Sequence, residues 1–312
     1  MKTPTKPDPM KTSALLVAAL CAFTFTAHAE VKFETIEYKQ GDATLEGYLA
    51  YDDAVKGKRP GVLIVHQILG AGVYEKKRAE MLAKLGYTAF ACDMYGKGIR
   101  FTAPTNAGAH MGELKSNRTL LRARAQAGLD VLKKHATVDA SRTAAIGYCS
   151  GGMTVLEMAR ANMDVRAVVS FHGLLDAQPG MEAKEKIKPV VLVCHGEADP
   201  TSTPAKVAAF KQEFLEGNAK ADMTFINYPG VLHAFTIWKP NGSGWNGAKY
   251  DKHADEDSWE KMQEVFARAF KLPSAGKPDA TERLKKVKAL YDQELINKED
   301  YDKKVKEIMD AL

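Results

Sequence analysis

The sequence has little cysteine, little excess charge and few long apolar runs. Four of its 312 residues are cysteines, and its formal net charge is +5. No Cys-x-x-Cys pair occurs, which disfavours a dithiol redox site. The positive charge is small and dispersed, so nucleic acid is not an expected partner. With 45% hydrophobic and 27% charged residues, the chain has a globular composition and the length of one large domain or two ordinary ones.

A marked apolar run lies near the start of the chain. It extends from Ala14 to Phe23, follows three lysines and precedes Ala27-His28-Ala29. This pattern predicts a secretory signal peptide over residues 1–29, cleaved after Ala29, and hence a periplasmic or secreted protein. The run is too short for a membrane span, so no stable membrane anchor is expected; an uncleaved N-terminal anchor is the alternative. Cleavage removes three lysines and one aspartate and leaves a net charge of +3.

Three cysteines remain in the mature chain: Cys92, Cys149 and Cys194. An odd number does not indicate a disulfide framework, and at least one thiol must be free. Cys92 and Cys194 follow apolar residues and are expected to be buried small side chains. A disulfide between these two is the alternative.

The most informative stretch runs from Arg142 to Met158. A short apolar segment leads into Gly147-Tyr148-Cys149-Ser150-Gly151-Gly152, and an apolar pattern of helical spacing follows. Strand, tight turn and helix with a nucleophilic side chain at the turn form a nucleophile elbow, here with cysteine in place of serine. The glycines give room for the turn, and the helix N-terminus favours a thiolate. A buried cysteine in a glycine-rich loop is the alternative.

Apolar runs and helical patterns alternate over the central part of the chain. The sequence predicts a hairpin over residues 31–51 and buried strands over 61–66, 87–92, 144–146, 167–172, 189–195 and 223–228. It predicts a loop over 97–111 and helices over 76–85, 113–135, the segment after Cys149, 204–216 and 257–270. This order is typical of an α/β fold with a mainly parallel central sheet flanked by helices. The active site of such a sheet lies at the carboxyl ends of its strands.

The last part of the chain differs in composition. Residues 30–271 form the predicted main domain, 272–280 a proline-containing linker, and 281–312 a helical hairpin. Thr281 and Asn297 can each cap one of its helices. So short a segment buries little core alone, so the hairpin is expected to dock on its own main domain, a second copy or another protein.

Two later strand ends offer partners for Cys149. Asp199 follows the predicted strand over 189–195, and His233 follows the last strand. The chain order nucleophile, acid, histidine is typical of α/β-hydrolases. We expect Asp199 to orient His233, and His233 to take the proton of Cys149 and later protonate the leaving group. Alternatively, Asp199 caps the next helix and His233 is an ordinary loop histidine.

The developing oxyanion of such a reaction needs two backbone N–H donors. One is expected from Ser150, directly after the nucleophile. The other is expected from the turn after the strand that ends at His66, and therefore from Gln67 or Ile68.

Together these motifs resemble the dienelactone hydrolase family over about residues 31–270. The similar stretches are His-Gln-Ile-Leu-Gly (66–70), Asp-Met-Tyr-Gly (93–96), Gly-Tyr-Cys-x-Gly-Gly (147–152), Gly-x-x-Asp-Pro (196–200), Gly-x-x-His-x-Phe (230–235) and the segment 250–259. The resemblance implies an α/β-hydrolase fold and a Cys149, His233 and Asp199 triad. It also implies hydrolysis of a small-molecule ester or lactone through a thioester acyl-enzyme, without a cofactor.

Two positions depart from this family. A glutamate that contacts the resting cysteine in well-studied members is replaced here by Gln67, whose neutral amide cannot accept a proton in the same way. Those members also hold a substrate carboxylate with arginines; Ile237 occupies one such position, and Arg118 or Arg122 is a candidate for the other. A less charged ester or lactone is therefore expected, in a pocket that includes Gln67, Tyr95, Phe235 and Trp238.

The segment from Arg283 to Leu312 resembles the short C-terminal helical domain called SHOCT, which is associated with oligomerisation. The resemblance rests on Leu-Tyr-Asp, Leu-Ile-Asn and Glu-Asp-Tyr in succession. It makes a homo-oligomer or a partner contact through residues 281–312 an expectation.

Three strand-end histidines, His66, His172 and His195, raise the alternative of a metal site with His233. No carboxylate or cysteine pair completes a ligand spacing, so no metal is expected, and such histidines are more often hydrogen-bonded supports. Two other functions compete with hydrolysis: a non-catalytic binding module on a hydrolase scaffold, and a thiol peroxidase that uses Cys149.

Overall fold

The computed structural model describes residues 30–216, 219–238, 246–272, 280–292 and 297–309. The predicted signal peptide and most of the predicted linker lie outside these ranges. The strands are β1 (Val31–Gln40), β2 (Ala43–Asp52), β3 (Arg59–Val65), β4 (Thr88–Cys92), β5 (Val138–Tyr148), β6 (Ala167–Phe171), β7 (Val190–Gly196) and β8 (Met223–Tyr228). The helices are α1 (Val73–Lys84), α2 (Pro104–Ser116), α3 (Arg118–Lys134), α4 (Ser150–Arg160), α5 (Pro204–Leu215), α6 (Lys252–Phe270), α7 (Ala280–Asp292) and α8 (Lys298–Met309).

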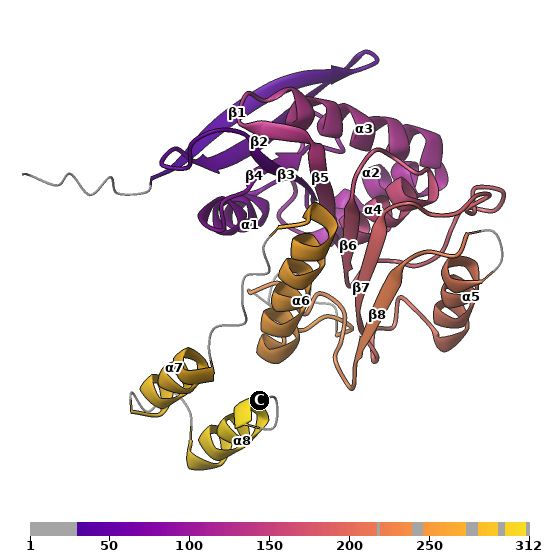
Figure 1. The fold of residues 1–312 in the computed structure, drawn as a ribbon. Coiled ribbons are helices and arrows are strands. Elements are labelled where there is room, and N and C mark those ends of the chain that lie inside the picture. Colours follow the sequence, from indigo (N-terminus) through magenta and orange to yellow (C-terminus); the bar gives the residue numbers. More distant parts are fainter. Residues whose placement is uncertain (1–29, 217–218, 239–245, 273–279, 293–296, 310–312) are drawn as a thin grey trace, which may run out of the picture.

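The described strands form one sheet in the order β1-β2-β4-β3-β5-β6-β7-β8. β1 and β2 form the predicted hairpin, and β2 pairs antiparallel with β4. Every other neighbouring pair is parallel, from β4 through β3, β5, β6 and β7 to β8. The predicted α/β-hydrolase-like fold with a mainly parallel sheet is therefore confirmed (Figure 1).

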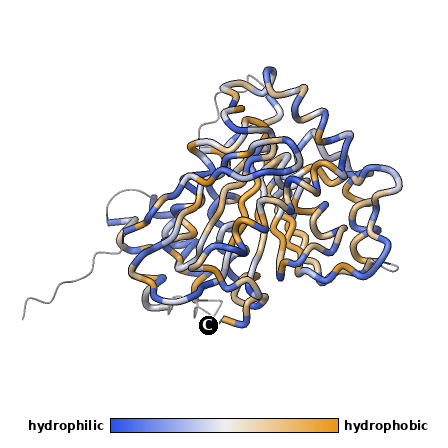
Figure 2. Tube along the Cα trace, turned by 90° about the horizontal axis from the view of Figure 1, so that it is seen from above, coloured by the Kyte–Doolittle hydropathy of each residue, from blue (hydrophilic) through white to orange (hydrophobic). Residues whose placement is uncertain are grey.

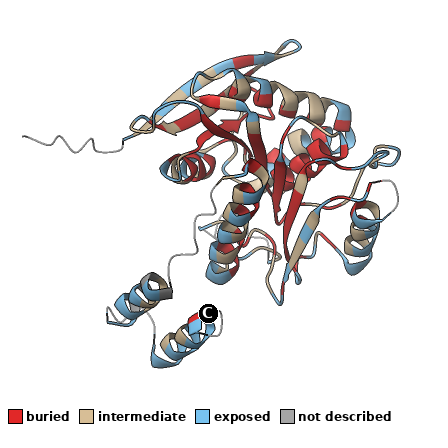
Figure 3. Ribbon diagram, in the orientation of Figure 1, coloured by how far each residue is buried: buried red, intermediate tan, exposed pale blue. Residues whose placement is uncertain are grey.

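Helices cover both faces of the sheet, which explains the continuous apolar strands. Along β3, Val62 and Ile64 face the core beneath α1 and α6, whereas Leu63 and Val65 face the core beneath α3, α4 and α5. Figure 2 shows the resulting apolar centre of the molecule, and Figure 3 shows that the central strands are buried while the outer helix surfaces are exposed.

The region before β5 differs from the prediction. The expected loop over 97–111 and single helix over 113–135 are wrong, because α2 begins at Pro104 and α3 follows it after a break at Asn117. Proline at the first helical position has the backbone angle that a helix needs. The Asn117 side chain accepts the Leu120 N–H at 3.0 Å and caps α3, so a new helix begins there.

Cys92 and Cys194 are free and buried. They belong to the two different cores on opposite faces of the sheet, so the alternative of a disulfide between them is wrong.

The predicted C-terminal helices are present. α7 and α8 pack against each other, with the rings of Tyr291 and Tyr301 centred 4.9 Å apart. Among the helices in the described ranges, none is both long enough and apolar enough to cross a membrane.

Candidate active site

The nucleophile elbow forms where β5 meets α4. Cys149 lies between them with φ 54° and ψ −111°, a backbone conformation that non-glycine residues rarely adopt. Its N–H donates to Phe171 O at 3.0 Å and to His172 Nδ1 at 3.1 Å. Strain of this kind costs about 1–3 kcal/mol and persists only where surrounding contacts enforce it, most often at functional sites.

Gly151 lets the start of α4 approach β3. A Cβ atom at this position would lie 2.1 Å from the backbone oxygen of Val65 and 2.8 Å from that of His66. Both oxygens belong to the main chain and cannot turn aside, so the elbow requires glycine here.

We therefore expect Gly151→Ala to lower the free energy of unfolding by roughly 1–3 kcal/mol, the usual cost of overpacking. Urea unfolding measures this change. Gly112→Ala in α2 is the matched control, since a Cβ there meets nothing within 4 Å. In a helix this control substitution stabilises by about 0.5–1 kcal/mol. Equal effects of the two substitutions would contradict the steric argument.

His233 and Asp199 meet beside Cys149. His233 Nδ1 lies 2.7 Å from Asp199 Oδ2, and both side chains are buried. Burial by itself lowers the pKa of His233, but attraction to the Cys149 sulfur and hydrogen bonds with Asp199 and Cys149 raise that pKa to about 10. The histidine thus stands between a carboxylate and a thiol, as the sequence predicted.

Asp199 is itself fixed from the other side. Its Oδ1 accepts the Thr201 N–H at 2.8 Å and the Thr201 hydroxyl at 2.7 Å. Burial raises the pKa of Asp199, but the His233 and Thr201 hydrogen bonds outweigh it and hold that pKa below its usual value. Asp199 therefore remains a carboxylate that accepts the His233 Nδ1–H.

A cavity of about 360 Å³ opens above these residues. Its wall is mostly apolar, with Cys149, Ser150 and His233 at the wall and two lysines, Lys115 and Lys249, among the lining residues. The apolar lining includes Ile68, Leu69, Pro104, Met111, Leu174 and Ile237.

Of the four predicted pocket residues, only Gln67 lines this cavity; the other three predictions are corrected. The Tyr95 hydroxyl points behind the cavity wall and donates to Ile68 O at 3.0 Å. Phe235 is fully buried in the core beneath α1 and α6. Trp238 donates to Asp255 Oδ2 at 2.9 Å and lies over the Arg78 guanidinium. Each of the three side chains is held outside the cavity lining by a contact with another part of the protein.

The loop after β3 carries the two backbone N–H groups, of Gln67 and Ile68, that were predicted as oxyanion donors. His66 Nε2 accepts the Met94 N–H at 3.1 Å, so the ring proton is on Nδ1, which donates to Gln67 O at 2.6 Å. In a trans peptide the carbonyl and the next N–H point in opposite directions, so the Ile68 N–H points away from His66. The Gln67 N–H is taken by Glu75 Oε1 at 3.4 Å. Of the two predicted donors, Ile68 is therefore the one with a free N–H among the described residues.

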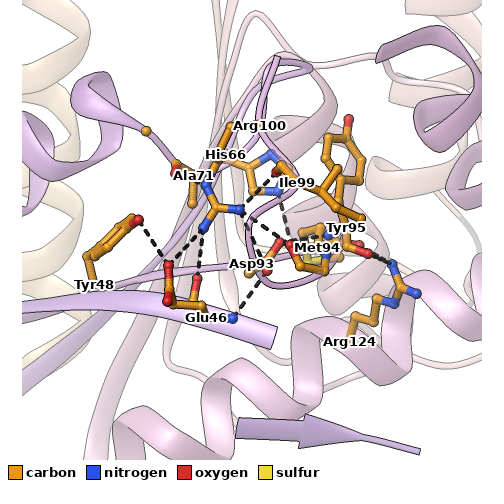
Figure 4. A network of polar contacts seen from close by, with 12 residues as sticks. Glu46, Tyr48, His66, Ala71, Asp93, Met94, Tyr95, Ile99, Arg100 and Arg124 are labelled. Atoms are coloured by element: carbon orange, nitrogen blue, oxygen red, sulfur yellow. Dashed lines mark hydrogen bonds and ion pairs between the residues drawn. The ribbon is translucent and has the colours of Figure 1, made fainter. Parts of the chain in front are cut away.

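A polar network stabilises the loop after β3 (Figure 4). Arg100 donates to Ala71 O and to Glu46 O, and Asp93 accepts the N–H groups of Tyr95 and Gly96. Burial lowers the pKa of His66 to about 4, so its ring stays neutral near pH 7. The loop that carries Ile68 is thus fixed before any substrate arrives.

Glu75 is a further support that the sequence did not reveal. It is buried and accepts the Gly72 N–H at 2.8 Å as well as the Gln67 N–H. Burial raises the pKa of this carboxyl to about 7. Gln67 turns its own side chain back onto the loop, where Oε1 accepts the Leu69 N–H at 3.1 Å. Gln67 therefore stabilises the turn with the same atom that a glutamate would use as a base.

The candidate arginines lie outside the cavity. Arg122 pairs with Glu157 at 2.6 Å, and buried Arg118 lies 3.9 Å from the same carboxylate. Neither lines the cavity, whereas Ile237 does. Within the described ranges, no three histidine, cysteine or acidic side chains are grouped so as to hold a metal ion.

Comparison with known proteins gives a consistent assignment. Residues 45–270 match the model of the dienelactone hydrolase family. The crystal structure of the dienelactone hydrolase-like promiscuous phosphotriesterase P91 from metagenomic libraries is 34% identical, with a TM-score of 0.73 over 77% of this chain and 99% of that chain. A Salmonella typhimurium protein named "Putative carboxymethylenebutenolidase" is 26% identical over 73% of this chain and 84% of its own length. A Caenorhabditis elegans protein, the uncharacterized K02A2.1, is 34% identical over 48% of this chain and 94% of its own length.

The family match covers most of the chain and includes Cys149, Asp199 and His233 with the loops that carry them. Members of this family hydrolyse esters or lactones, which are small-molecule substrates. The chain therefore belongs to the dienelactone hydrolase family and is an ester- or lactone-hydrolysing enzyme.

Proposed function

We propose that the enzyme uses Cys149 as nucleophile, His233 as acid and base, and Asp199 as the group that orients His233. One observation carries this proposal: His233 contacts both other residues. Its Nδ1 lies against Asp199, and it also forms a hydrogen bond with Cys149. Cys149 and His233 both lie at the wall of the same cavity. The chemistry then needs neither a metal nor a cofactor.

The Cys149 sulfur attacks the ester carbonyl carbon after its proton has passed to His233. The C–O bond breaks, and the leaving alkoxide takes the proton from His233, which leaves a thioester on Cys149. Water then gives a proton to His233 and attacks the thioester, releasing the carboxylic acid and restoring the thiol. In both steps the oxyanion accepts hydrogen bonds from the N–H groups of Ser150 and Ile68.

The substrate that suits the cavity is an ester or lactone with an apolar acyl part. Leu69, Met111 and Leu174 line the cavity, and Ile237 occupies the position where the family resemblance implies a carboxylate-binding arginine. Arg118 and Arg122 are engaged by Glu157. A muconate-type dienelactone, which carries a carboxylate, is therefore a poorer candidate than a less charged ester or lactone.

Pre-steady-state hydrolysis of an aryl ester tests the mechanism. We expect a burst of phenol equal to the enzyme concentration and an acyl adduct that mass spectrometry maps to Cys149. Two results together would favour a non-catalytic binding module. The enzyme would turn over none of a broad panel of esters and lactones, and tight ligand binding would survive the loss of all three triad residues. Peroxide consumption that needs Cys149 but not His233 would favour a peroxidase.

Phosphotriester hydrolysis is a second candidate activity. It is favoured by the 34% identity with P91, which is described as a promiscuous phosphotriesterase. A neutral aryl phosphotriester belongs in the same panel. A phosphoryl adduct on Cys149 without release of free enzyme would limit this chemistry to inhibition.

We also propose that residues 1–29 are a secretory signal peptide and that the enzyme works in the periplasm or outside the cell. The lysines, the apolar run and Ala27-His28-Ala29 support this. N-terminal sequencing of the exported protein is expected to begin at Glu30. If the protein keeps residues 1–29 and stays in the cytoplasmic fraction, the proposed signal peptide and export are ruled out.

For the tail, we propose that the SHOCT-like segment 281–312 mediates contact with a second copy or another protein. Tyr291 and Met309 are exposed on α7 and α8 although both are apolar or aromatic. Light scattering can measure the mass in solution of the full chain and of a chain that ends at residue 272. Equal monomer masses would exclude self-association through the tail.

A further inference from the structure

His172 is a second histidine beside Cys149 and His233, and neither the triad nor the oxyanion donors include it. It directly follows β6, its φ is 41°, and it is fully buried although it helps to line the cavity. Its ring lies edge-on to the ring of His233, with centroids 5.1 Å apart and an interplanar angle of 66°. A ring in this position touches both the nucleophile and the base.

The hydrogen bonds of His172 define its proton. Its Nδ1 accepts the Cys149 N–H at 3.1 Å, so the ring proton is on Nε2, which donates to Thr236 Oγ1 at 2.8 Å. Burial, followed by the positive charges of His233 and Arg78, lowers the pKa of His172 well below its usual value. The ring is therefore a neutral bridge with one acceptor and one donor.

The far end of this bridge is anchored in the core. Thr236 lies three residues after His233 on the same loop and is fully buried. Its Oγ1 lies 2.8 Å from the Tyr74 hydroxyl oxygen, which accepts the Arg78 Nε–H at 3.0 Å. Arg78 also donates to Thr236 O at 3.1 Å and pairs with buried Asp255 at 2.5 Å. These hydrogen bonds thus connect the loop that carries His233 and Thr236 to α1 and α6.

We propose that His172 is a positioning residue that sets the separation of the Cys149 sulfur and the His233 imidazole. It joins the backbone of the elbow, through Cys149 N–H, to the loop of the base, through Thr236. This inference rests on the proposed roles of Cys149 and His233. Without His172 the Cys149 N–H keeps only Phe171 O as acceptor, and the link between the two catalytic loops is lost.

Three substitutions separate this role from simple packing. His172→Leu removes both hydrogen bonds, His172→Asn keeps an acceptor close to the position of Nδ1, and Thr236→Val breaks the link while keeping the ring. His135→Leu is the control, since His135 lies at the C-terminal end of α3, has its ring Nδ1 2.8 Å from Thr137 Oγ1 and does not line the cavity. The readouts are kcat and KM for an aryl ester and the rate at which iodoacetamide alkylates Cys149 between pH 5 and 9.

We expect His172→Leu to lower kcat on the order of 10²-fold with little change in KM, as a small misplacement of reacting groups does. Alkylation of Cys149 should slow and its pH profile should shift. His172→Asn should recover most of both losses, and Thr236→Val should give intermediate losses. The control should change stability but neither kcat nor alkylation.

The inference is overturned if kcat falls only in proportion to the folded fraction and the alkylation profile does not move. It is also overturned if Asn and Leu at position 172 are equivalent. If His172→Leu does not fold, the Asn and Thr236→Val variants decide the question. Alkylation needs no turnover, so failure of the proposed function, seen as full activity of Cys149→Ala, is distinguishable from failure of this inference.

Discussion

Replacing Cys149 by alanine is expected to lower kcat for ester hydrolysis by on the order of 10⁴–10⁶-fold, because loss of a catalytic nucleophile alone removes nearly all that the triad contributes. The burst and the covalent adduct should disappear, whereas the fold should remain. Alanine fits in place of cysteine, and the contacts that enforce the turn come from the Cys149 backbone N–H. Stopped-flow kinetics and urea unfolding measure the two effects.

Cys149→Ser is the matched control for this prediction. A hydroxyl keeps the size and position of the thiol but is a weaker nucleophile at neutral pH. It should retain measurable turnover and carry an oxygen ester in place of the thioester. Full activity of the alanine variant on every ester that the enzyme hydrolyses would exclude Cys149 as nucleophile and leave only the family assignment.

The mainly parallel sheet, and the meeting of Cys149, Asp199 and His233 at one edge of it, were predictable because both depend on patterns that the sequence displays. Fully buried parallel strands read as apolar runs, and β3, β7 and the last part of β5, from Ala144 on, are such runs. Their carboxyl ends meet at one edge of the sheet, so Cys149, Asp199 and His233 could be brought together without knowing any distance.

The lining of the cavity was not predictable in the same way. Phe235 is two residues from His233, but the positive φ of Ala234 (57°) turns the chain between them, and the phenyl ring enters the core. Trp238 follows the same loop and is drawn to Asp255, which is distant in sequence. Met111 and Lys115 reach the cavity from α2, a helix that its glycine- and alanine-rich sequence concealed.

His172 carried a signal that was available but ambiguous. A histidine at the end of a buried strand, beside the elbow strand, is either a ligand, a support or a core residue. Only its two partners, Cys149 N–H and Thr236 Oγ1, distinguish these possibilities, and Thr236 is 64 residues away along the chain. Glu75 was equally hidden, since its partners are backbone N–H groups.

Asp199→Asn is expected to lower kcat by about 10²–10⁴-fold with little loss of structure, as removal of the orienting carboxylate does in a serine triad. The reason lies in the partners of the two carboxylate oxygens. Oδ1 accepts two hydrogen bonds from Thr201, so an asparagine keeps its oxygen there and places its NH₂ group against His233. His233 Nδ1 must then accept, the proton moves to Nε2, and the ring can no longer take the proton of Cys149.

The same variant has a defined pH signature. In the wild type the pKa of His233 is raised from its ordinary value of 6.5 to about 10, so the protonated ring stabilises the fold fully below about pH 6.5 and not at all above about pH 10. The hydrogen bond and the negative charge of Asp199 account for part of this increase in the pKa of His233. The difference in free energy of unfolding between wild type and Asp199→Asn should therefore shrink as pH rises from about 7 to about 10. Urea unfolding across this range, with kcat measured in parallel, checks both effects.

Asp139→Asn is the control for the loss of an aspartate. Asp139 lies at the start of β5, at the opposite end of that strand from Cys149, and pairs with Arg142 at 2.7 Å. Side-chain hydrogen bonds with Ser141 and Arg142 lower the pKa of Asp139 to about 2, so its contribution to stability is lost only in acid and is constant from pH 7 to 10. This control should keep kcat. If Asp199→Asn also keeps kcat, or if its stability difference from wild type stays constant up to pH 10, Asp199 does not orient His233, and the base must be held by another group.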